Sequence, residues 1–279
     1  MDIHPPLSLQ LTPYDLPLFP NTLKRRRRKG VILELTTENG KKGYADVAEC
    51  RYSSLSFALE SAYEQTTNDI PNTNLQITAL VLHEKDAEKA YGQGYRTFKV
   101  KKPSTSFLKH LRVTYPEVSL RVDFNQSLSL KEAKNIIRHF SPEEFSYLEE
   151  PLQNFSDLTS LFPFPIAVDE SLYLYPLDRI ISLPNLKAIV VKPTLFGGYS
   201  RCKQLQKRGI DIILSSYYES GLGLLNIAQL AISLHIQEPL GIDTYRFLQK
   251  DILQKPLPIT YGILSYQRGS YQLASRYSS

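Results

Sequence analysis

The sequence predicts an α/β protein in which a (β/α)8 barrel follows a smaller N-terminal unit of strands and a helix. Three observations lead to this prediction. Short apolar segments alternate with helical stretches from about residue 76 onward. The apolar segments are continuous rather than alternating, which is typical of parallel strands buried on both faces. About eight such repeats fit into the 279 residues, and eight repeats close a barrel.

The N-terminal part of the chain has a different pattern. Residues 30–36 are rich in strand formers, and residues 43–47 can pair back onto them through a turn at Asn39 and Gly40. Residues 54–65 have a helical pattern, and residues 68–74 form a loop of Asn, Asp, Pro and Thr. We therefore expect a separate α+β domain that ends at this loop.

The barrel is expected over residues 76–245, after an α+β domain over residues 1–75, and the tail over residues 246–279 is expected to pack back on that domain. The expected strands of the barrel are residues 76–82, 97–100, 119–122, 147–148, 166–168, 188–191, 211–214 and a last one near 241–242. The expected helices between them include residues 129–140, 199–208 and 224–235.

Cysteine content and hydropathy limit the cellular compartments in which the protein is expected. Cys50 and Cys202 are far apart in sequence and make neither a disulfide framework nor a Cys-x-x-Cys site, which favours a reducing compartment. The N-terminus has no basic segment followed by an apolar core, so it does not resemble a secretory signal. Because no apolar stretch approaches the roughly 20 residues that cross a bilayer, we expect a cytoplasmic protein without a membrane span.

The net charge of +5 comes largely from one basic run, Lys24-Arg25-Arg26-Arg27-Arg28-Lys29. Without these six residues the chain has 27 basic and 28 acidic residues. Such a run is usually a solvated loop, but it could also attract an anionic substrate. A non-catalytic nucleic-acid-binding protein is the remote alternative, and it predicts binding that weakens as salt rises.

Charged groups follow the apolar strands at regular intervals. They are Lys101, Asp123, Glu149, Asp169 and Lys192, separated by 20 to 26 residues, which is about one strand and helix each. Ser215 and Ser216 follow the next strand. One charged group per repeat, always after the strand, places the set on the C-terminal rim of the barrel, where active sites lie. Taken singly, each is an ordinary charge at a strand end, but the ordered set indicates a site.

The alternation of strand residues decides which side chains meet. Lys99 and Lys101 point to the same side of their strand, and so do Arg121, Asp123 and Asn125 on the next. If those sides face the barrel lumen, three carboxylates meet there and repel one another unless a cation holds them. Oxygen ligands without Cys or clustered His favour a hard ion such as Mg²⁺.

Lysines beside such an ion are suited to removing a proton next to a carboxylate, because the ion neutralises the enediolate that forms. A lysine base must be neutral to accept that proton, and nearby positive charge favours the neutral amine.

The order of these motifs resembles the muconate-lactonizing subgroup of the enolase superfamily. The motifs are Lys-x-Lys at 99–101, Asp-x-Asn at 123–125, Glu-Glu-Pro at 149–151, Asp-Glu-Ser at 169–171 and a lysine at 192. The segments at 191–198, 215–223 and 241–244 are more specifically similar to the o-succinylbenzoate synthase family. The resemblance covers about residues 24 to 250. It implies an α/β fold, a modified (β/α)8 TIM-type barrel with a small α+β N-terminal capping domain.

The resemblance also implies the metal site. Its ligands would be Asp123, Glu149 and Asp169, with Glu149 preferred to Glu150 because the first acid of that pair is the family's ligand. The implied cofactor is Mg²⁺, with Mn²⁺ as a substitute.

The implied catalytic residues are Lys101, as the acid and base, and Lys192, which would stabilise the anionic intermediate from the other face of the ring. The implied substrate-binding residues are Lys99, Arg121, Ser215, Ser216, Glu219 and Ser220. The implied reaction is the syn-dehydration of 2-succinyl-6-hydroxy-2,4-cyclohexadiene-1-carboxylate to 2-succinylbenzoate in menaquinone biosynthesis, through a metal-stabilised enediolate. The enzyme would be a carbon–oxygen lyase, and its partner a small dicarboxylate.

Other enzymes of the subgroup stay open as alternatives. An N-succinylamino acid racemase needs a base on each face of its substrate, and Lys101 and Lys192 could supply them. Muconate cycloisomerase is a further alternative. Dipeptide epimerases usually have an Asp-x-Asp motif near the eighth strand, and the Gly-Ile-Asp at 241–243 does not fit it. The chain contains no Trp, and the family often has one shortly after Asp-x-Asn, so the loops that select the substrate are left undetermined. The sequence carries no signal for a particular oligomeric state.

Overall fold

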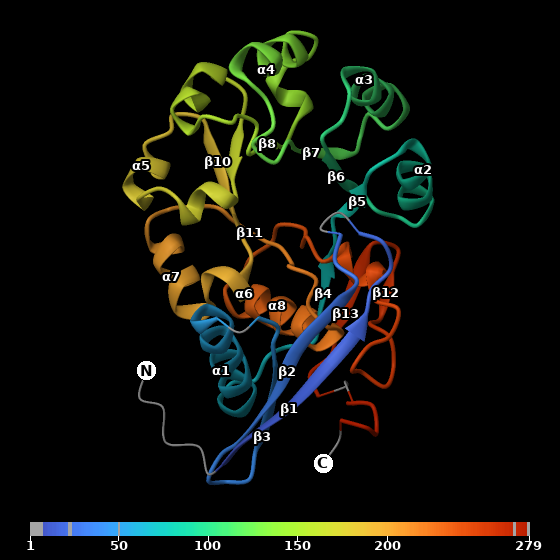
Figure 1. Cartoon of the computed structure of the whole chain (residues 1–279), viewed down its shortest axis with the longest axis vertical. Coiled ribbons are helices and arrows are strands. Elements are labelled where there is room, and N and C mark those ends of the chain that lie inside the picture. The colour runs from blue at the N-terminus through green and yellow to red at the C-terminus, as the bar shows by residue number, and fades with distance from the viewer. Residues whose placement is uncertain (1–7, 22–23, 50, 270–271, 278–279) are drawn as a thin grey trace.

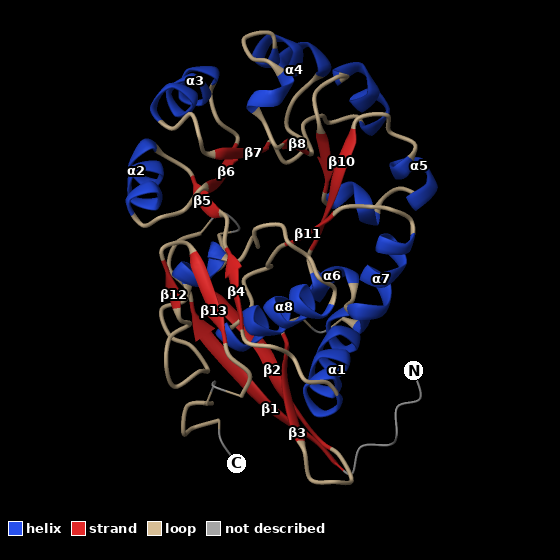
Figure 2. Cartoon of the chain, turned by 180° about the vertical axis from the view of Figure 1, so that it is seen from behind, coloured by secondary structure: helices blue, strands red, loops and turns tan. Residues whose placement is uncertain are grey.

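Parallel strands curl around a common axis and form the larger part of the molecule (Figures 1 and 2). The computed structural model describes residues 8–21, 24–49, 51–269 and 272–277, so Cys50 and the first seven residues lie outside the described part of the chain. Within it, seven strands form one sheet in the order β11-β10-β9-β8-β7-β6-β5, each parallel to its neighbour. The strands are β5 Ala79–Val81, β6 Thr97–Lys101, β7 Ser119–Asp123, β8 Tyr147–Glu149, β9 Ile166–Val168, β10 Leu186–Val191 and β11 Ile212–Leu214.

Two isolated parallel bridges close the ring where an eighth strand was expected. Ser215 pairs with Gly241, and Ile77 pairs with Leu240. The segment is too short to count as a strand because Pro239 precedes it and has no N–H to donate. A 3-10 helix, η4 Asp243–Phe247, follows directly. The expected strand at 241–242 is therefore reduced to a two-residue closure.

Helices surround the sheet on its outer side (Figure 1). They are α2 Glu84–Gly92, α3 Thr105–Thr114, α4 Leu130–Ile137, α5 Leu177–Ile181, α6 Pro193–Phe196, α7 Tyr199–Lys207 and α8 Gly221–Ser233, with 3-10 turns η1 Pro142–Glu144, η2 Phe155–Leu161 and η3 Glu170–Tyr173. Helix α4 begins with a capping box, in which Ser129 Oγ accepts from the Glu132 N–H and Glu132 Oε2 accepts from the Ser129 N–H. Two predicted helices have other bounds in the structure. The helix predicted over 129–140 ends three residues earlier, at Ile137, and the helix predicted over 224–235 begins earlier, at Gly221.

The N-terminal sheet consists of β1 Ser8–Pro17, β2 Arg27–Thr36 and β3 Lys42–Val47, which pair antiparallel in that order. Strand β1 was not expected, because Pro13 and Pro17 interrupt its pattern; an edge strand tolerates them. Helix α1 Tyr52–Thr67 packs closely on β3. At Gly43 an added Cβ would lie 1.9 Å from the Ala62 carbonyl oxygen, so glycine is required for this approach.

The C-terminal tail forms a second small sheet. Strands β12 Ile259–Thr260 and β13 Ile263–Tyr266 pair with each other, and β13 pairs with β4 Thr73–Gln76. The predicted domain boundary near residue 75 therefore falls inside a strand, and the boundary itself stays a prediction. The tail also reaches the end of β1, where the Gln249 N–H donates to the Pro17 carbonyl at 3.1 Å.

Helix α8 lies between the barrel and the N-terminal sheet and buries every residue from 221 to 232 (Figures 1 and 2). A buried polar network joins the two parts. The Asp46 carboxylate of β3 accepts from the Tyr14 hydroxyl at 2.6 Å and from the Ser220 hydroxyl at 2.6 Å. The Asp46 N–H donates to Asn226 Oδ1 of α8 at 3.1 Å. The sheet is thereby held against the N-terminal half of α8. No helix in the described residues combines the length and apolar character needed to span a bilayer.

Candidate active site

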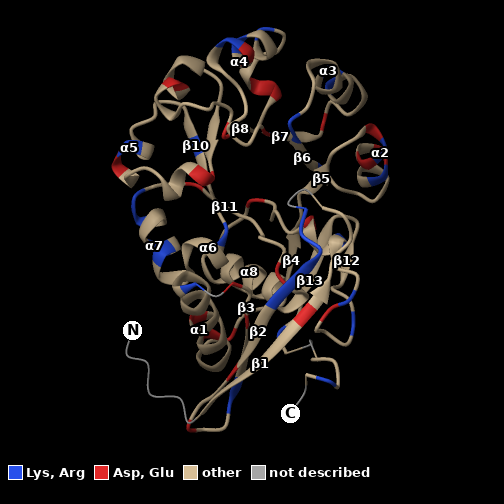
Figure 3. Ribbon diagram, in the orientation of Figure 1, with Lys and Arg blue, Asp and Glu red and all other residues tan. Residues whose placement is uncertain are grey.

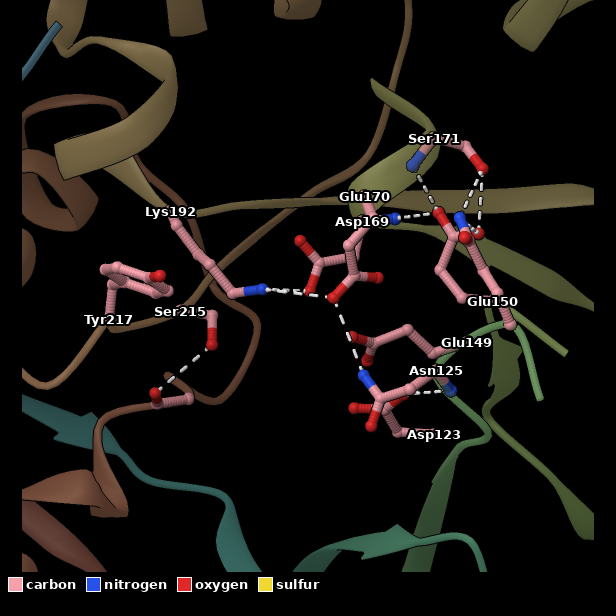
Figure 4. A network of polar contacts seen from close by, with 12 residues as sticks. Asp123, Asn125, Glu149, Glu150, Asp169, Glu170, Ser171, Lys192, Ser215 and Tyr217 are labelled. Carbon is pink, nitrogen blue, oxygen red and sulfur yellow. Dashed lines mark hydrogen bonds and ion pairs between the residues drawn. The ribbon is translucent and has the colours of Figure 1, made fainter. Parts of the chain in front are cut away.

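Three acids and three lysines gather at the C-terminal rim of the barrel. Figure 4 shows the acids Asp123, Glu149 and Asp169 together with Lys192. Strand register brings the first of them together, since Lys101 pairs with Asp123 and Asp123 pairs with Glu149 on adjacent strands. Lys99 Nζ lies 3.1 Å from Asp123 Oδ2 and 2.6 Å from Glu149 Oε1. Lys101 Nζ lies 3.2 Å from Asp123 Oδ2.

On the other side of the acids, Lys192 follows β10 and forms an ion pair with Asp169, which follows β9. Lys192 Nζ also lies 3.9 Å from Glu170 Oε1. Asn125 connects the two sides: its Oδ1 accepts from Lys101 at 3.4 Å, and its Nδ2 donates to Glu170 Oε1 at 3.5 Å. The acids are thus flanked by an ammonium group on each side.

Burial and mutual repulsion give the neighbouring acids Asp123 and Glu149 very different pKa values. Burial opposes the charged form of Asp123, but Lys99 and Lys101 outweigh it and lower the pKa of Asp123 to about 2. Burial and the negative charge of Asp123 raise the pKa of Glu149 to about 8, although Lys99 opposes this. The pKa of Lys99 itself is raised despite its burial, because Asp123 and Glu149 favour its charged form. The carboxylates of the site therefore repel one another, and nearby positive charge offsets that repulsion.

Two of the three acids have a buried oxygen that no described residue hydrogen-bonds, Glu149 Oε2 and Asp169 Oδ1. Asp123 Oδ2 instead lies 3.1 Å from Lys99 Nζ and 3.2 Å from Lys101 Nζ. All three side chains are buried. The described residues contain no group of three acids already arranged to hold a metal ion, and Lys99 and Lys192 lie against these carboxylates. The donor set is nevertheless hard oxygen only, which suits Mg²⁺ or Mn²⁺.

A cavity of about 290 Å³ opens beside these groups. Its basic and acidic lining residues are Lys99, Lys101, Lys102, Lys192, Glu170 and Asp243, and its other lining residues are Thr78, Leu80, Asn125, Ser215, Ser216, Tyr217, Tyr218, Gly241 and Thr244. The volume is at the lower end of the range for small-molecule sites. Four lysines against two acids give the cavity a basic lining.

Comparison with known proteins identifies the family. Residues 83–270 match the family described as enolase C-terminal domain-like. The chain belongs to the enolase superfamily. It is 28% identical over 228 residues to the o-succinylbenzoate synthase of Edwardsiella ictaluri, covering 74% of this chain and 70% of that one. It is 33% identical over 153 residues to the synthase of Pectobacterium atrosepticum, covering 50% of this chain and 46% of that one, so this match spans about half of the relative's length.

Among solved structures, the chain is similar to the o-succinylbenzoate synthase of Thermosynechococcus elongatus, which was determined with Mg in its active site. The TM-score is 0.73 with 23% identity, and the alignment covers 86% of this chain and 94% of that one. At this identity the likeness shows the fold. It confirms the predicted fold class for this enolase superfamily member, a modified (β/α)8 barrel with an N-terminal capping domain.

The structure of this superfamily member brings Ser215 and Ser216 to the cavity, as the sequence suggested, but places Arg121 elsewhere. Arg121 donates to Thr78 Oγ1 at 2.9 Å, to the Pro239 carbonyl at 2.8 Å and to Glu238 Oε2 at 2.7 Å. It is not among the residues that line the cavity in the described part of the chain. Its position two residues before Asp123 puts it deeper in the lumen. There it connects Thr78 to Pro239, next to the bridge that closes the ring of strands.

Glu219 and Ser220 also lie outside the cavity lining of the described structure. Ser220 caps helix α8 by accepting from the Gly223 N–H, and its own hydroxyl donates to Asp46. Glu219 is buried and accepts from the Tyr217 N–H at 2.5 Å. Ser220 thus connects the barrel to the capping domain, while Glu219 holds the loop that follows β11.

The basic run is a loop over its first half only, where Lys24 and Arg26 are exposed. Its second half belongs to β2, so its side chains alternate, and the run lies beside the barrel opening (Figure 3). Arg28 is 1% exposed and donates to Glu49 Oε1 at 2.6 Å and to the Tyr217 carbonyl at 2.9 Å. Arg25 donates to Glu49 at 2.8 Å and to the Tyr217 hydroxyl at 3.0 Å. Since Tyr217 lines the cavity, these arginines support its wall from the capping domain.

Replacing Arg28 with alanine is expected to lower the unfolding free energy by about 2 to 3 kcal/mol, because a buried side chain is lost and the Tyr217 carbonyl loses its donor. Arg27 on the opposite face of the same strand is the matched control. Its ion pair with Asp15 is exposed, so alanine there should cost at most about 0.5 kcal/mol. Urea unfolding of both variants measures the difference, and equal costs would contradict the assigned role of Arg28.

Sequence reasoning missed Asp243 as a cavity residue. Its Oδ2 accepts from the Leu80 N–H at 2.9 Å and lies 3.5 Å from Arg246. Burial raises the pKa of Asp243 to about 6 from 3.8, against the opposing effect of Arg246. The aspartate follows the Leu240–Gly241 closure, which no strand pattern marks clearly.

The raised pKa of Asp243 predicts a pH-dependent stability. Between the unfolded value near 3.8 and the folded value of about 6, the folded state binds more protons, so this contribution to stability falls as pH rises. Asparagine at 243 removes the titration. The unfolding free energy of Asp243→Asn relative to the parent should therefore improve by about 2 kcal/mol between pH 4.5 and pH 7.5. Urea unfolding at both pH values tests this, and a pH-independent difference would contradict it.

Proposed function

We propose that the protein is an o-succinylbenzoate synthase that dehydrates 2-succinyl-6-hydroxy-2,4-cyclohexadiene-1-carboxylate to 2-succinylbenzoate, a step of menaquinone biosynthesis. The observation that carries the proposal is a cluster of three buried acids beside the cavity, with Lys101 and Lys192, which line the cavity, on opposite sides of it. The names of the relatives in Edwardsiella ictaluri and Pectobacterium atrosepticum support the choice within the superfamily.

Asp123, Glu149 and Asp169 would hold the divalent ion, since all three are buried carboxylates, and Glu149 Oε2 and Asp169 Oδ1 have no hydrogen-bond partner in the described residues. Mg²⁺ is the proposed ion, with Mn²⁺ as a substitute. When bound, it supplies positive charge that offsets the negative charge gained by the substrate carboxylate during proton removal.

Lys101 would act as the base and then as the acid. It removes the proton alpha to the ring carboxylate, and it returns a proton to the hydroxyl group that leaves as water. A C–H bond and a C–O bond break, and the ring becomes aromatic. Because one residue does both, the proton and the hydroxyl leave from the same face, which is a syn elimination. Lys192, on the far side of the acids, would stabilise the negative charge, and Lys99 would orient the carboxylate.

The cavity lining suits a dianionic substrate. Lys101, Lys102 and Lys192 give it positive charge, which raises the local concentration of anions. Ser215 and Ser216 also line the cavity, but their hydroxyl groups donate to the Gly241 carbonyl at 3.3 and 2.9 Å, and Tyr217 offers a ring. The lysines are therefore the donors that the cavity offers to the substrate carboxylates.

The direct test is an assay of the purified protein with the cyclohexadiene substrate, with Mg²⁺ and after removal of metal by a chelator. We expect turnover to an aromatic product that requires the metal and returns when Mg²⁺ is restored. Absence of turnover with metal present would contradict the proposed function.

N-succinylamino acid racemisation is the second candidate, because lysines lie on both sides of the acids. Racemisation needs both Lys101 and Lys192 as bases, whereas syn-dehydration needs only Lys101 as a base. Incubation of each N-succinylamino acid enantiomer in deuterated water therefore separates the two functions, since only a racemase exchanges the alpha proton of both enantiomers. Exchange of neither enantiomer would remove this candidate.

A further inference from the structure

Glu150 follows Glu149 directly, and its side chain has no part in the proposed chemistry. It is 2% exposed and accepts four hydrogen bonds. Oε1 accepts from the Asp169 N–H at 2.8 Å and from the Ser171 N–H at 2.7 Å. Oε2 accepts from Ser171 Oγ at 2.8 Å (Figure 4) and from Gln126 Nε2 at 3.0 Å. The carboxylate is thus fully occupied by protein donors, whereas Glu149 and Asp169 each have an oxygen without a hydrogen-bond partner in the described residues.

These bonds join the loops that follow three adjacent strands, β7, β8 and β9. Gln126 belongs to the loop after β7, and its N–H also donates to the Glu150 carbonyl at 2.7 Å. Ser171 belongs to the turn after β9, and its Oγ accepts from Gln126 Nε2 at 3.2 Å. The Glu150 N–H donates to the Ala167 carbonyl at 3.1 Å. Glu150 therefore contacts both neighbouring loops through its backbone and its side chain.

Each of the three loops begins with one of the proposed metal-binding acids. Gln126 comes three residues after Asp123, Glu150 comes one after Glu149, and Ser171 comes two after Asp169. The bond to the Asp169 N–H acts on a proposed ligand residue itself. Any shift of the Glu150 carboxylate would therefore change the relative positions of the acids.

Backbone conformation shows that these loops are held against their own preference. Asn125, Gln126 and Glu150 have φ angles of +46°, +54° and +42°, in the left-handed region that residues with a side chain rarely adopt. Such conformations persist only where the surroundings determine them. At two of these positions, Gln126 and Glu150, the hydrogen bonds of the Glu150 carboxylate help to hold the conformation.

We propose that Glu150 is a positioning residue, which holds the three acid-bearing loops in register and thereby sets the affinity for the divalent ion without touching it. This inference rests on the proposed function, since it requires the three acids to bind a metal. It assigns the effect to the reach and hydrogen bonds of the side chain and not to its negative charge.

Two substitutions separate reach from charge. Glu150→Gln keeps the length of the side chain, and its amide oxygen can still accept from the N–H groups of Asp169 and Ser171, but the charge is lost. Glu150→Asp keeps the charge and shortens the side chain by one methylene, so it cannot reach both neighbouring loops at once. Partners that orient metal ligands typically change metal affinity by about 10- to 100-fold when they are lost.

The measurement is titration of the whole protein with Mn²⁺, followed by electron paramagnetic resonance of the free ion and by calorimetry with Mg²⁺. We expect Glu150→Asp to weaken binding by about 10- to 100-fold and Glu150→Gln by less than about threefold. Equal losses in the two variants, or a greater loss in Glu150→Gln, would overturn the inference, because charge would then be the cause.

Asp251→Asn is the matched control. Asp251 is another enclosed carboxylate that accepts backbone N–H bonds, from Gly221 at 2.9 Å and from Ile252 at 2.7 Å, but it lies outside the cavity lining of the described chain. It should lower the thermal unfolding midpoint while leaving Mn²⁺ affinity within about threefold. An equal loss of affinity in this control would show a general effect of destabilisation and would overturn the role of Glu150.

The wild-type titration separates this inference from the proposed function. If the wild-type protein binds no divalent ion, the metal site itself is refuted. If it binds Mn²⁺ and Glu150→Asp binds it equally well, only the positioning role is refuted. A Glu150→Asp variant that does not fold, as judged by circular dichroism, is replaced by Ser171→Ala, which removes one of the four bonds and should weaken Mn²⁺ binding by at least threefold. Unchanged Mn²⁺ binding in Ser171→Ala would likewise overturn the positioning role.

Discussion

Replacing Lys101 with alanine is expected to lower kcat for dehydration by about 10³- to 10⁴-fold, because one side chain supplies both the base and the acid. Lys101 Nζ is poised at the cavity, 3.2 Å from Asp123 Oδ2 and 3.4 Å from Asn125 Oδ1. The affinity for Mg²⁺ should not fall, since the substitution removes a positive charge beside the acids. Steady-state rates with the cyclohexadiene substrate, together with Mg²⁺ titration, measure the two effects separately.

Lys101→Arg serves as the comparison for charge. The guanidinium keeps the positive charge but does not lose its proton at neutral pH, so this variant should be nearly as inactive as Lys101→Ala. Lys109→Ala, on the outer helix α3, controls for the loss of a lysine elsewhere and should retain full activity. Substantial turnover by either Lys101 variant would remove this residue as the base.

Asp169→Asn is expected to weaken Mg²⁺ binding and to lower kcat/KM by about 10²- to 10³-fold, since charge stabilisation by a bound ion is worth several kcal/mol. Asp169 offers a buried oxygen without a partner among the described residues, and asparagine at this position has the same shape but no charge. The loss should be partly recovered by raising the concentration of Mg²⁺, which a loss of a catalytic base would not allow.

Asp178→Asn is the matched control for this second variant, because Asp178 pairs with Arg208 on an exposed surface of the barrel. It should leave metal binding and turnover unchanged. Activity of Asp169→Asn equal to that of the parent at low Mg²⁺ would show that Asp169 is not a ligand.

The alternation of β and α segments was enough to predict the barrel, and the polar groups after each strand were enough to predict its rim. Both depend on local rules, because parallel strands point the same way and side chains alternate along each strand. The approach of Lys99 and Lys101 to Asp123 follows from that geometry alone. The eighth strand was predicted less well, since closure by Leu240 and Gly241 depends on their partners and not on their own pattern.

The sequence pattern did not predict how deep each side chain lies along the barrel axis. Arg121 and Asp123 share one side of β7, but two residues separate them by about 7 Å along the strand. Asp123 consequently reaches the rim, while Arg121 pairs with Glu238 beneath the cavity. The alternation of side chains places both residues in the lumen, but it does not show which of them lies at the C-terminal rim.

The fold class and the acids and lysines of the rim could be predicted from the sequence alone, because they follow from neighbours within one strand and from the repeat length. The roles of Arg28, Ser220 and Glu150 became clear only from the packing of the folded chain. Arg28 meets the carbonyl of Tyr217, 189 positions away, and Ser220 meets Asp46, 174 positions away. Glu150 receives donors from two other loops. A buried polar side chain takes its role from whichever partner satisfies it, and the packing of distant segments determines which partner that is.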